Sequence, residues 1–104
     1  MKKIGVGIIG LGYVGNIHLR HLVRLQNVDY VAAADISKKA LDYAKSCGAD
    51  KTFSNYQDLL KEPNIDAVII ALPTHLHLQC VIQASEAKKH IFLEKPIWRI
   101  IDHT

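Results

Sequence analysis

The stretch that decides the fold is Gly10-Leu11-Gly12-Tyr13-Val14-Gly15, which follows an apolar run and leads into a helical pattern. Each glycine at this spacing has its own task in a strand–turn–helix unit. Gly10 permits the tight turn out of the strand, Gly12 lets a ligand approach the backbone closely, and Gly15 lets the helix pack against the strand. The N-terminus of that helix offers N–H groups and positive dipole charge to an anion. The stretch therefore predicts a cradle for phosphate groups.

An acidic residue after the next apolar run narrows the ligand to a dinucleotide. Asp35 lies 20 residues after Gly15, at the end of the run 28–34, and its carboxylate can accept hydrogen bonds from both hydroxyls of an adenosine ribose. Alternatively, Asp35 is a capping acid ahead of Ser37. Lys38 and Lys39 could reach the 2′-phosphate of NADP, but Asp35 would repel that phosphate. NAD is therefore the preferred cofactor and NADP the alternative.

Short apolar runs alternate with amphipathic segments along the whole chain. This alternation predicts an α/β fold with a doubly wound parallel sheet, in strand order 3-2-1-4-5, between helices on both faces, which is a three-layer αβα arrangement. The expected strands are Lys3–Ile9, Val28–Ala34, Thr52–Phe53, Ala67–Leu72 and His90–Leu93. The expected helices are Val14–Leu25, Lys38–Cys47, a turn or two capped by Ser54 or Asn55, and Leu76–Ala87.

The helical face of the first of these helices is expected to bury Val14, Ile17, Leu22 and Leu25. Ligands of such a sheet bind at the carboxyl ends of the strands, where the strand order reverses. That edge is expected to gather four stretches of the sequence, namely the glycine loop 10–15, Asp35, Pro73-Thr74-His75 and Glu94-Lys95-Pro96. Their convergence on one crevice is stronger support for a site than any single motif.

Four motifs together resemble one family. They are the glycine loop with His18 shortly after it, Ala33-Ala34-Asp35, Ala71-Leu72-Pro73-Thr74-His75-Leu76-His77, and Glu94-Lys95-Pro96. Over residues 3–96 the chain resembles the NAD(P)-binding Rossmann domain of the glucose–fructose oxidoreductase, inositol dehydrogenase and rhizopine catabolism (Gfo/Idh/MocA) family of oxidoreductases. The Glu-Lys-Pro stretch after a fifth strand is the most specific of these motifs, because generic dinucleotide-binding domains lack it.

The resemblance implies roles for the matching positions. It implies that Lys95 sits beside a substrate hydroxyl and assists proton transfer, that Glu94 contacts the nicotinamide ribose, and that the bond before Pro96 is a candidate for a cis peptide. A solvated lysine is the alternative for Lys95. The cofactor-binding residues that it implies are Gly10, Gly12, Tyr13, Val14, Gly15, Asp35, Leu72, Pro73, Thr74, His75, His77, Glu94 and Lys95.

The domain organisation limits the function that these 104 residues are expected to have. We expect a dinucleotide-binding domain over residues 1–96 and a short atypical tail over 97–104. The resemblance implies a second α/β domain that supplies an aspartate and a histidine for catalysis, and the sequence given does not contain it. The expected function is hydride transfer between a nicotinamide cofactor and a sugar- or polyol-type alcohol. The alternative is a nucleotide-binding module without turnover, or a truncated remnant.

Composition argues against several other classes. The net charge of +3 includes no basic stripe, so nucleic acid is not an expected partner. No apolar run is long enough for a membrane span, and the start of the chain lacks a signal-peptide cleavage site. Cys47 and Cys80 have no metal-ligand spacing, and neither do the histidine pairs 18/21 and 75/77, so no metal site is expected. Free thiols favour a cytoplasmic location.

The end of the chain predicts self-association. The strand His90–Leu93 would be an edge strand, and four large apolar residues follow it, namely Ile97, Trp98, Ile100 and Ile101. An unpaired strand edge beside an apolar segment is typical of an interface. We expect a homo-oligomer through this edge and the segment Ile97–Ile101. The alternative is a monomer in which the tail folds back over its own sheet.

Overall fold

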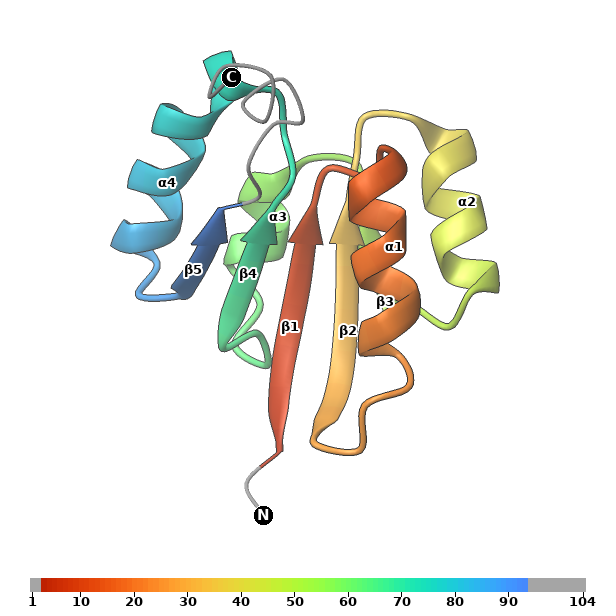
Figure 1. The fold of residues 1–104 in the computed structure, drawn as a ribbon. Coiled ribbons are helices and arrows are strands. Elements are labelled where there is room, and N and C mark those ends of the chain that lie inside the picture. The colour runs from red at the N-terminus through yellow and green to blue at the C-terminus, as the bar shows by residue number, and fades with distance from the viewer. Residues whose placement is uncertain (1–2, 94–104) are drawn as a thin grey trace, which may run out of the picture.

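A computed structural model describes residues 3–93 of the chain, and these form one parallel sheet between two layers of helices (Figure 1). The strand order is β3-β2-β1-β4-β5 and every neighbouring pair is parallel, as predicted. The strands are β1 (Ile4–Ile9), β2 (Val28–Ala34), β3 (Lys51–Phe53), β4 (Ala67–Ile70) and β5 (His90–Leu93). The helices are α1 (Tyr13–Leu22), α2 (Lys38–Ser46), α3 (Tyr56–Leu60) and α4 (His77–Glu86), and a 3₁₀ turn, η1 (Thr74–Leu76), precedes α4.

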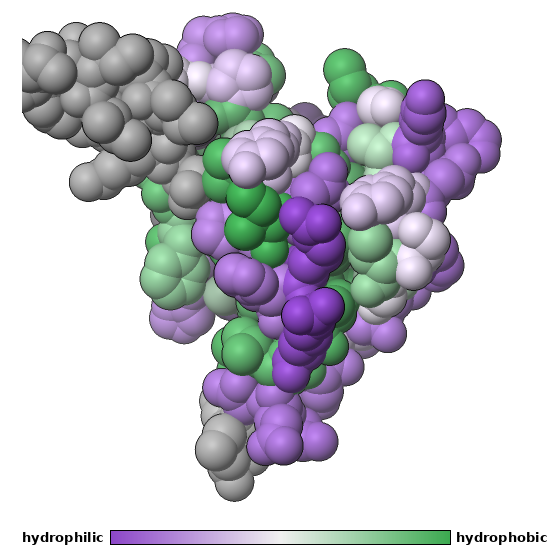
Figure 2. All heavy atoms as spheres, turned by 45° about the vertical axis from the view of Figure 1, so that its right-hand side comes forward, coloured by the Kyte–Doolittle hydropathy of each residue, from purple (hydrophilic) through white to green (hydrophobic). Residues whose placement is uncertain are grey.

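The strands are apolar on both faces because helices cover both. Ile8 and Ile9 are adjacent in β1, yet they belong to separate hydrophobic clusters. Ile8 packs with Leu19 of α1 and Ala44 of α2, whereas Ile9 packs on the side of α3 and α4. Successive side chains of a strand point to opposite faces, so each strand serves two cores. The outer surface of α1 and α2 is largely hydrophilic, with smaller hydrophobic areas between (Figure 2).

Two strands, β2 and β5, have the bounds that the sequence predicts, but α1 is shorter than predicted. It ends at Leu22, and the turn after it has i→i−3 bonds, including the one from Leu25 N–H to the Leu22 carbonyl. Leu25 is 49% exposed, whereas Leu19 is fully buried. The predicted helical face was therefore wrong at Leu25, because the chain leaves the helix before that residue can reach the sheet.

The strand β4 is also shorter than predicted. It ends at Ile70 rather than Leu72, and α4 begins at His77 rather than Leu76, after η1. The apolar run continues to Leu72, but pairing with β1 stops at Ile70 and with β5 at the same residue. Ala71 makes the last backbone bond to β1, from its N–H to the Ile9 carbonyl, and the chain leaves the sheet at Leu72.

Local capping agrees with the sequence. The Ser37 hydroxyl accepts a hydrogen bond from the Ala40 N–H at the start of α2. Of the two candidates for α3, it is Asn55 that caps, through the Asp58 N–H. Gly48 has a φ of 115° just after α2, a conformation that suits glycine at the end of a helix.

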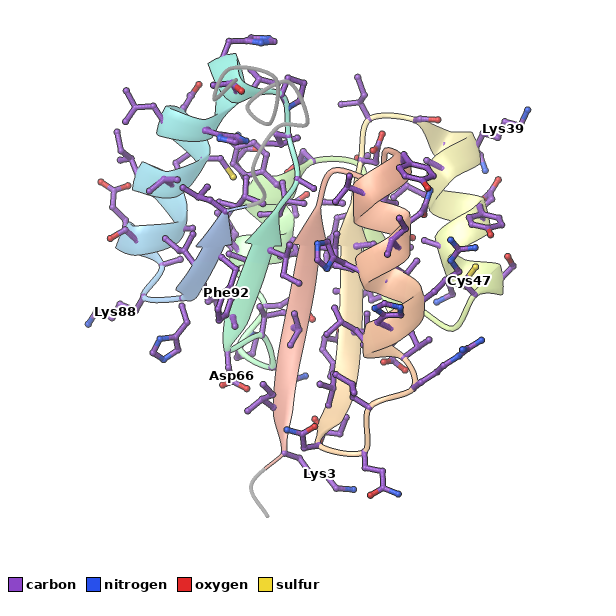
Figure 3. All side chains as sticks on the ribbon, viewed as in Figure 1. Lys3, Lys39, Cys47, Asp66, Lys88 and Phe92 are labelled. Atoms are coloured by element: carbon purple, nitrogen blue, oxygen red, sulfur yellow. The ribbon has the colours of Figure 1, made fainter. Side chains whose placement is uncertain are left out.

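A carboxylate holds the amino end of β1, far from the glycine loop. Asp66, labelled in Figure 3, accepts a hydrogen bond of 2.9 Å from the Gly5 N–H, and its own N–H donates to the Gly5 carbonyl at 2.8 Å. This pair of bonds fixes the start of β4 beside β1. Among residues 3–93, no helix has the length and apolar character that crossing a bilayer demands.

Candidate functional site

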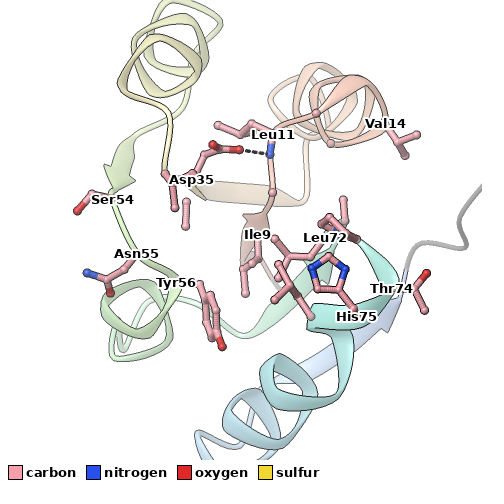
Figure 4. Close-up of a pocket in the computed structure, with 18 of the residues that line it drawn as sticks. Ile9, Leu11, Val14, Asp35, Ser54, Asn55, Tyr56, Leu72, Thr74 and His75 are labelled. Carbon is pink, nitrogen blue, oxygen red and sulfur yellow. Dashed lines mark hydrogen bonds between the residues drawn. The ribbon is translucent and has the colours of Figure 1, made fainter.

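A pocket of about 1150 Å³ opens at the carboxyl edge of the sheet. Loops after four strands form it, and Figure 4 shows their side chains around one hollow. The lining residues are 9–15, from the last residue of β1 onward, 34–36, from the last residue of β2 onward, 54–57 after β3 and 71–76 after β4. Three of the four stretches predicted from the sequence, the glycine loop, Asp35 and Pro73–His75, therefore lie around one cavity.

The three glycines of the loop differ in what surrounds them. Gly10 has a φ of 97°, and a Cβ there would lie 2.7 Å from the Ala71 carbonyl oxygen. A Cβ on Gly15 would lie 2.0 Å from the Gly10 carbonyl oxygen. A Cβ on Gly12 would meet no atom within 4 Å. Packing therefore requires glycine at Gly10 and Gly15, whereas the space beside Gly12 is open for a ligand.

The N-terminus of α1 points into this pocket without a side-chain cap. Gly12 is the N-cap residue, and no side chain accepts a hydrogen bond from the first turn, which also contains no acidic residue. Residues 13–15 of that turn line the pocket. The first N–H groups of a helix have no acceptor within it and favour an anion. An anionic group bound here would accept hydrogen bonds from the first N–H groups of α1, as the Ser37 and Asn55 side chains do at α2 and α3.

Asp35 holds the glycine loop as well as facing the pocket. One carboxylate oxygen accepts a hydrogen bond of 2.7 Å from the Leu11 N–H, the contact marked in Figure 4, and the other accepts one of 2.8 Å from the Ser37 N–H. The Leu11 carbonyl accepts a bond of 3.1 Å from the Asn16 amide. Side-chain hydrogen bonds thus hold both the N–H and the carbonyl of Leu11. A carboxylate has about four lone-pair positions, so Asp35 keeps acceptor capacity for ribose hydroxyls.

The segment after β4 forms the opposite wall. Leu72, Pro73, Thr74 and His75 all line the pocket. His77 does not line it. Its Nε2 atom lies 2.6 Å from the Leu72 carbonyl oxygen, so the ring turns back toward the loop. The predicted site residues Glu94 and Lys95, with Pro96, lie outside the described residues.

The loop after β3 also belongs to the pocket, although no motif in the sequence predicts it. Ser54, Asn55, Tyr56 and Gln57 line the pocket, and so does Ile36, which is 95% exposed. The rule that ligands lie at the carboxyl ends of strands covers β3 too, so its position in the strand order was an available signal. For Ile36, the available signal was its position, because it is a large apolar residue directly after Asp35.

Two titratable groups at or behind the pocket wall, Tyr56 and Cys80, have raised pKa values. Burial raises the pKa of the Tyr56 phenol, and the neighbouring Cys80 thiol raises it further. Burial also raises the pKa of Cys80 to about 11. Both groups are therefore neutral near pH 7. Within residues 3–93, no three His, Cys, Asp or Glu side chains come together in a way that could hold a metal ion.

Comparison with known proteins agrees with this geometry. Residues 4–102 match the model of the oxidoreductase family with an NAD-binding Rossmann fold (GFO_IDH_MocA). An uncharacterized oxidoreductase, YrbE, of Bacillus subtilis strain 168 is 40% identical over 99% of this chain and 30% of its own length. Myo-inositol 2-dehydrogenase of Thermotoga maritima is 34% identical over 88% of this chain and 28% of its own length.

Solved structures give the same result. Scyllo-inositol dehydrogenase of Lactobacillus casei, with bound NAD(H) and scyllo-inositol, has a TM-score of 0.83 and 37% identity over 98% of this chain. This chain covers 32% of that structure and about 30% of the curated relatives. The match over nearly the whole chain, together with the glycine loop and the strand order, shows that this chain belongs to the Gfo/Idh/MocA oxidoreductase family and comprises its NAD-binding Rossmann domain.

Proposed function

We propose that this chain supplies the cofactor site of an oxidoreductase that transfers a hydride between NAD and an alcohol of the sugar or polyol class. Membership of the family supports the reaction class. Two of the relatives reported above are named for inositols, and one of them, the Lactobacillus casei enzyme, was solved with scyllo-inositol. The chain spans about 30% of those relatives, so most of the substrate pocket would come from a second domain.

The open space beside Gly12 is the observation that best supports NAD binding. The fold does not need glycine there, because a Cβ would touch nothing within 4 Å. A pyrophosphate against the uncapped start of α1 would use this space, with contacts to the loop residues Gly10, Gly12, Tyr13, Val14 and Gly15.

The two halves of the dinucleotide would extend to either side of β1. Asp35 at the end of β2 would accept bonds from the adenosine ribose. The nicotinamide half would follow Leu72, Pro73, Thr74 and His75 after β4, because β4 lies on the other side of β1 from β2.

NAD is the proposed cofactor in preference to NADP. The Asp35 carboxylate would face the 2′ position of the adenosine ribose and repel a phosphate there. Lys38 is 3.6 Å from Asp42 in an exposed ion pair, which partly offsets its positive charge. The predicted roles of Glu94 at the nicotinamide ribose and of Lys95 in proton transfer are part of the proposal.

Calorimetric titration with NADH tests the cofactor proposal. Gly12→Val should abolish measurable binding, because its side chain would fill the space for the pyrophosphate. Gly12→Ala should weaken binding while leaving the free energy of unfolding within ~0.5 kcal/mol of wild type, the usual range for a substitution that meets no neighbour. NADPH should bind more weakly than NADH. Absence of NADH binding at millimolar concentration, or full affinity in Gly12→Val, would refute the proposal.

A nucleotide-binding module without turnover is the second candidate for the 104 residues acting alone, and their limited span of the relatives favours it. The isolated chain, mixed with NAD and an inositol, should give no increase in absorbance at the NADH band. Reduction that disappears in Lys95→Ala would instead make the chain a minimal enzyme.

We also propose that the protein is cytoplasmic and self-associates. Cys47 and Cys80 are both free thiols, which suits a reducing compartment. The strand β5 is an edge of the sheet among the described residues, and its Phe92 and Leu93 are 64% and 51% exposed. The segment Ile97–Ile101 lies outside those residues. Light scattering after size-exclusion chromatography should show a dimer or larger species, and a monomer at high micromolar concentration would contradict this.

A further inference from the structure

The imidazole of His77 is fixed on a backbone carbonyl beside the pocket. His77 is the first residue of α4, is partly buried, and its Nε2 lies 2.6 Å from the Leu72 carbonyl oxygen. A carbonyl oxygen only accepts hydrogen bonds, so Nε2 carries the proton and donates. The bond spans the 3₁₀ turn and ties the start of α4 to the residue that leaves the sheet after β4.

The tied residue, Leu72, lies beside the glycine loop. The last ladder bond on this side of β1 runs from the Ala71 N–H to the Ile9 carbonyl at 2.8 Å, and Leu72 follows it. A Cβ on Gly10 would lie 2.7 Å from the Ala71 carbonyl oxygen and 3.2 Å from a methyl carbon of Leu72. Residues 71 and 72 of the wall after β4 therefore lie close against Gly10 of the loop after β1.

That wall lies on one side of the site. The strand β1 sits between β2, which ends at Asp35, and β4, which leads to Leu72. With the adenosine ribose at Asp35 and the pyrophosphate at the glycine loop, as proposed above, Leu72 faces the nicotinamide half. A change confined to Leu72 should therefore alter the binding of NADH and not of AMP.

We propose that His77 is a positioning residue, whose Nε2–H holds the Leu72 carbonyl so that the wall after β4 fits the nicotinamide half of the cofactor. His77 lies outside the pocket lining and acts through Leu72. The inference rests on the proposed function, because it assumes that NAD occupies the pocket in that orientation.

Calorimetric titration of NADH and of AMP into matched variants tests the role. His77→Leu removes the donor, so the Leu72 carbonyl must be ordered when NADH binds. This cost, at most that of one hydrogen bond, should weaken NADH binding about fivefold while AMP affinity changes less than about twofold. His77→Gln keeps an N–H₂ group near the position of Nε2 and should restore most of the affinity. His21→Leu, a change of the same kind at the exposed end of α1 and outside the pocket lining, should match wild type for both ligands.

The outcomes separate the two proposals. If wild type fails to bind NADH, the proposed function fails and this inference falls with it. If wild type binds NADH but His77→Leu weakens AMP and NADH equally, or weakens neither, the positioning role alone is refuted.

A measurement on the unmodified chain guards against a His77→Leu variant that does not fold. Long-range ¹H–¹⁵N spectra should show His77 protonated at Nε2 in the ligand-free protein. A neutral ring protonated only at Nδ1 would overturn the proposal, since such a ring cannot donate to the Leu72 carbonyl.

Discussion

Replacing Asp35 with alanine should destabilise the protein even when no cofactor is present. The substitution removes the acceptors of two backbone N–H groups, those of Leu11 at 2.7 Å and Ser37 at 2.8 Å. Leu11 is buried at 4% exposure and its bond to Asp35 is partly buried, so its N–H would lose a charged acceptor where water has limited access. Such a loss costs about 1.5–3 kcal/mol. Ser37 is exposed, so water replaces its partner at little cost.

Urea denaturation of the ligand-free protein, followed by circular dichroism, measures this loss. The free energy of unfolding of Asp35→Ala should fall by about 1.5–3 kcal/mol. Asp35→Asn keeps one acceptor oxygen, so its free energy of unfolding should lie between those of wild type and Asp35→Ala. Asp66→Ala is the matched control, because it removes a carboxylate acceptor from the buried Gly5 N–H at the other end of β1. The control should lose stability but keep its affinity for NADH.

Binding data then separate two explanations of Asp35. If the residue only recognised ribose, Asp35→Ala would lose NADH affinity and keep its full stability. An unfolding free energy within ~0.5 kcal/mol of wild type, the range of ordinary surface substitutions, would therefore refute the role of Asp35 as an anchor of the glycine loop.

Three further outcomes follow from particular residues. Gly15→Ala should destabilise the ligand-free protein by several kcal/mol or prevent folding, because its Cβ would lie 2.0 Å from the Gly10 carbonyl oxygen. The same urea titration measures this loss, and a variant as stable as wild type would contradict the packing. Lys88→Gly should raise the unfolding free energy by about 0.5–1 kcal/mol, because Lys88 has a φ of 62° at the end of α4. Cys80, whose pKa burial raises to about 11 from an ordinary value of 9.0, should make stability fall as pH rises from 9 toward 11, because its unfolded thiol ionises first. Cys80→Ala should flatten that fall in denaturation curves measured across this pH range, and an unchanged slope would assign it to other groups.

The sequence was sufficient for the strand order and for most strand bounds, because apolar runs and glycine spacing are local signals. The sequence did not predict the ends of β4 and α1, because an apolar residue can continue the pattern of an element without belonging to it. Leu72 extends the apolar run of β4, but it lines the pocket instead of pairing in the sheet. Leu25 fits a helical period, yet α1 ends three residues earlier, at Leu22, and Leu25 is exposed.

The site was only partly predictable for a different reason. The spacing between the glycine loop and Asp35 matches a known motif and can be read from the sequence. The bond between Asp35 and Leu11 joins residues 24 apart and exists only in the folded chain. The contact of His77 with Leu72 likewise depends on the 3₁₀ turn between them. The residues 54–57 carry no motif, so only the position of β3 in the sheet indicates that they line the pocket.

The bond from the Leu11 N–H to Asp35 has a consequence for how cofactor preference can change during evolution or engineering. A switch toward NADP calls for removal of the acidic charge at Asp35, but the same step deprives a buried backbone donor of its acceptor. A lineage that changes preference must therefore pass through a less stable intermediate or acquire a replacement acceptor near Leu11 at the same time. Cofactor choice is thereby protected against single substitutions, and libraries that vary position 35 together with Asn16, whose amide holds the other side of Leu11, should yield stable NADP-binding variants that libraries of position 35 alone do not.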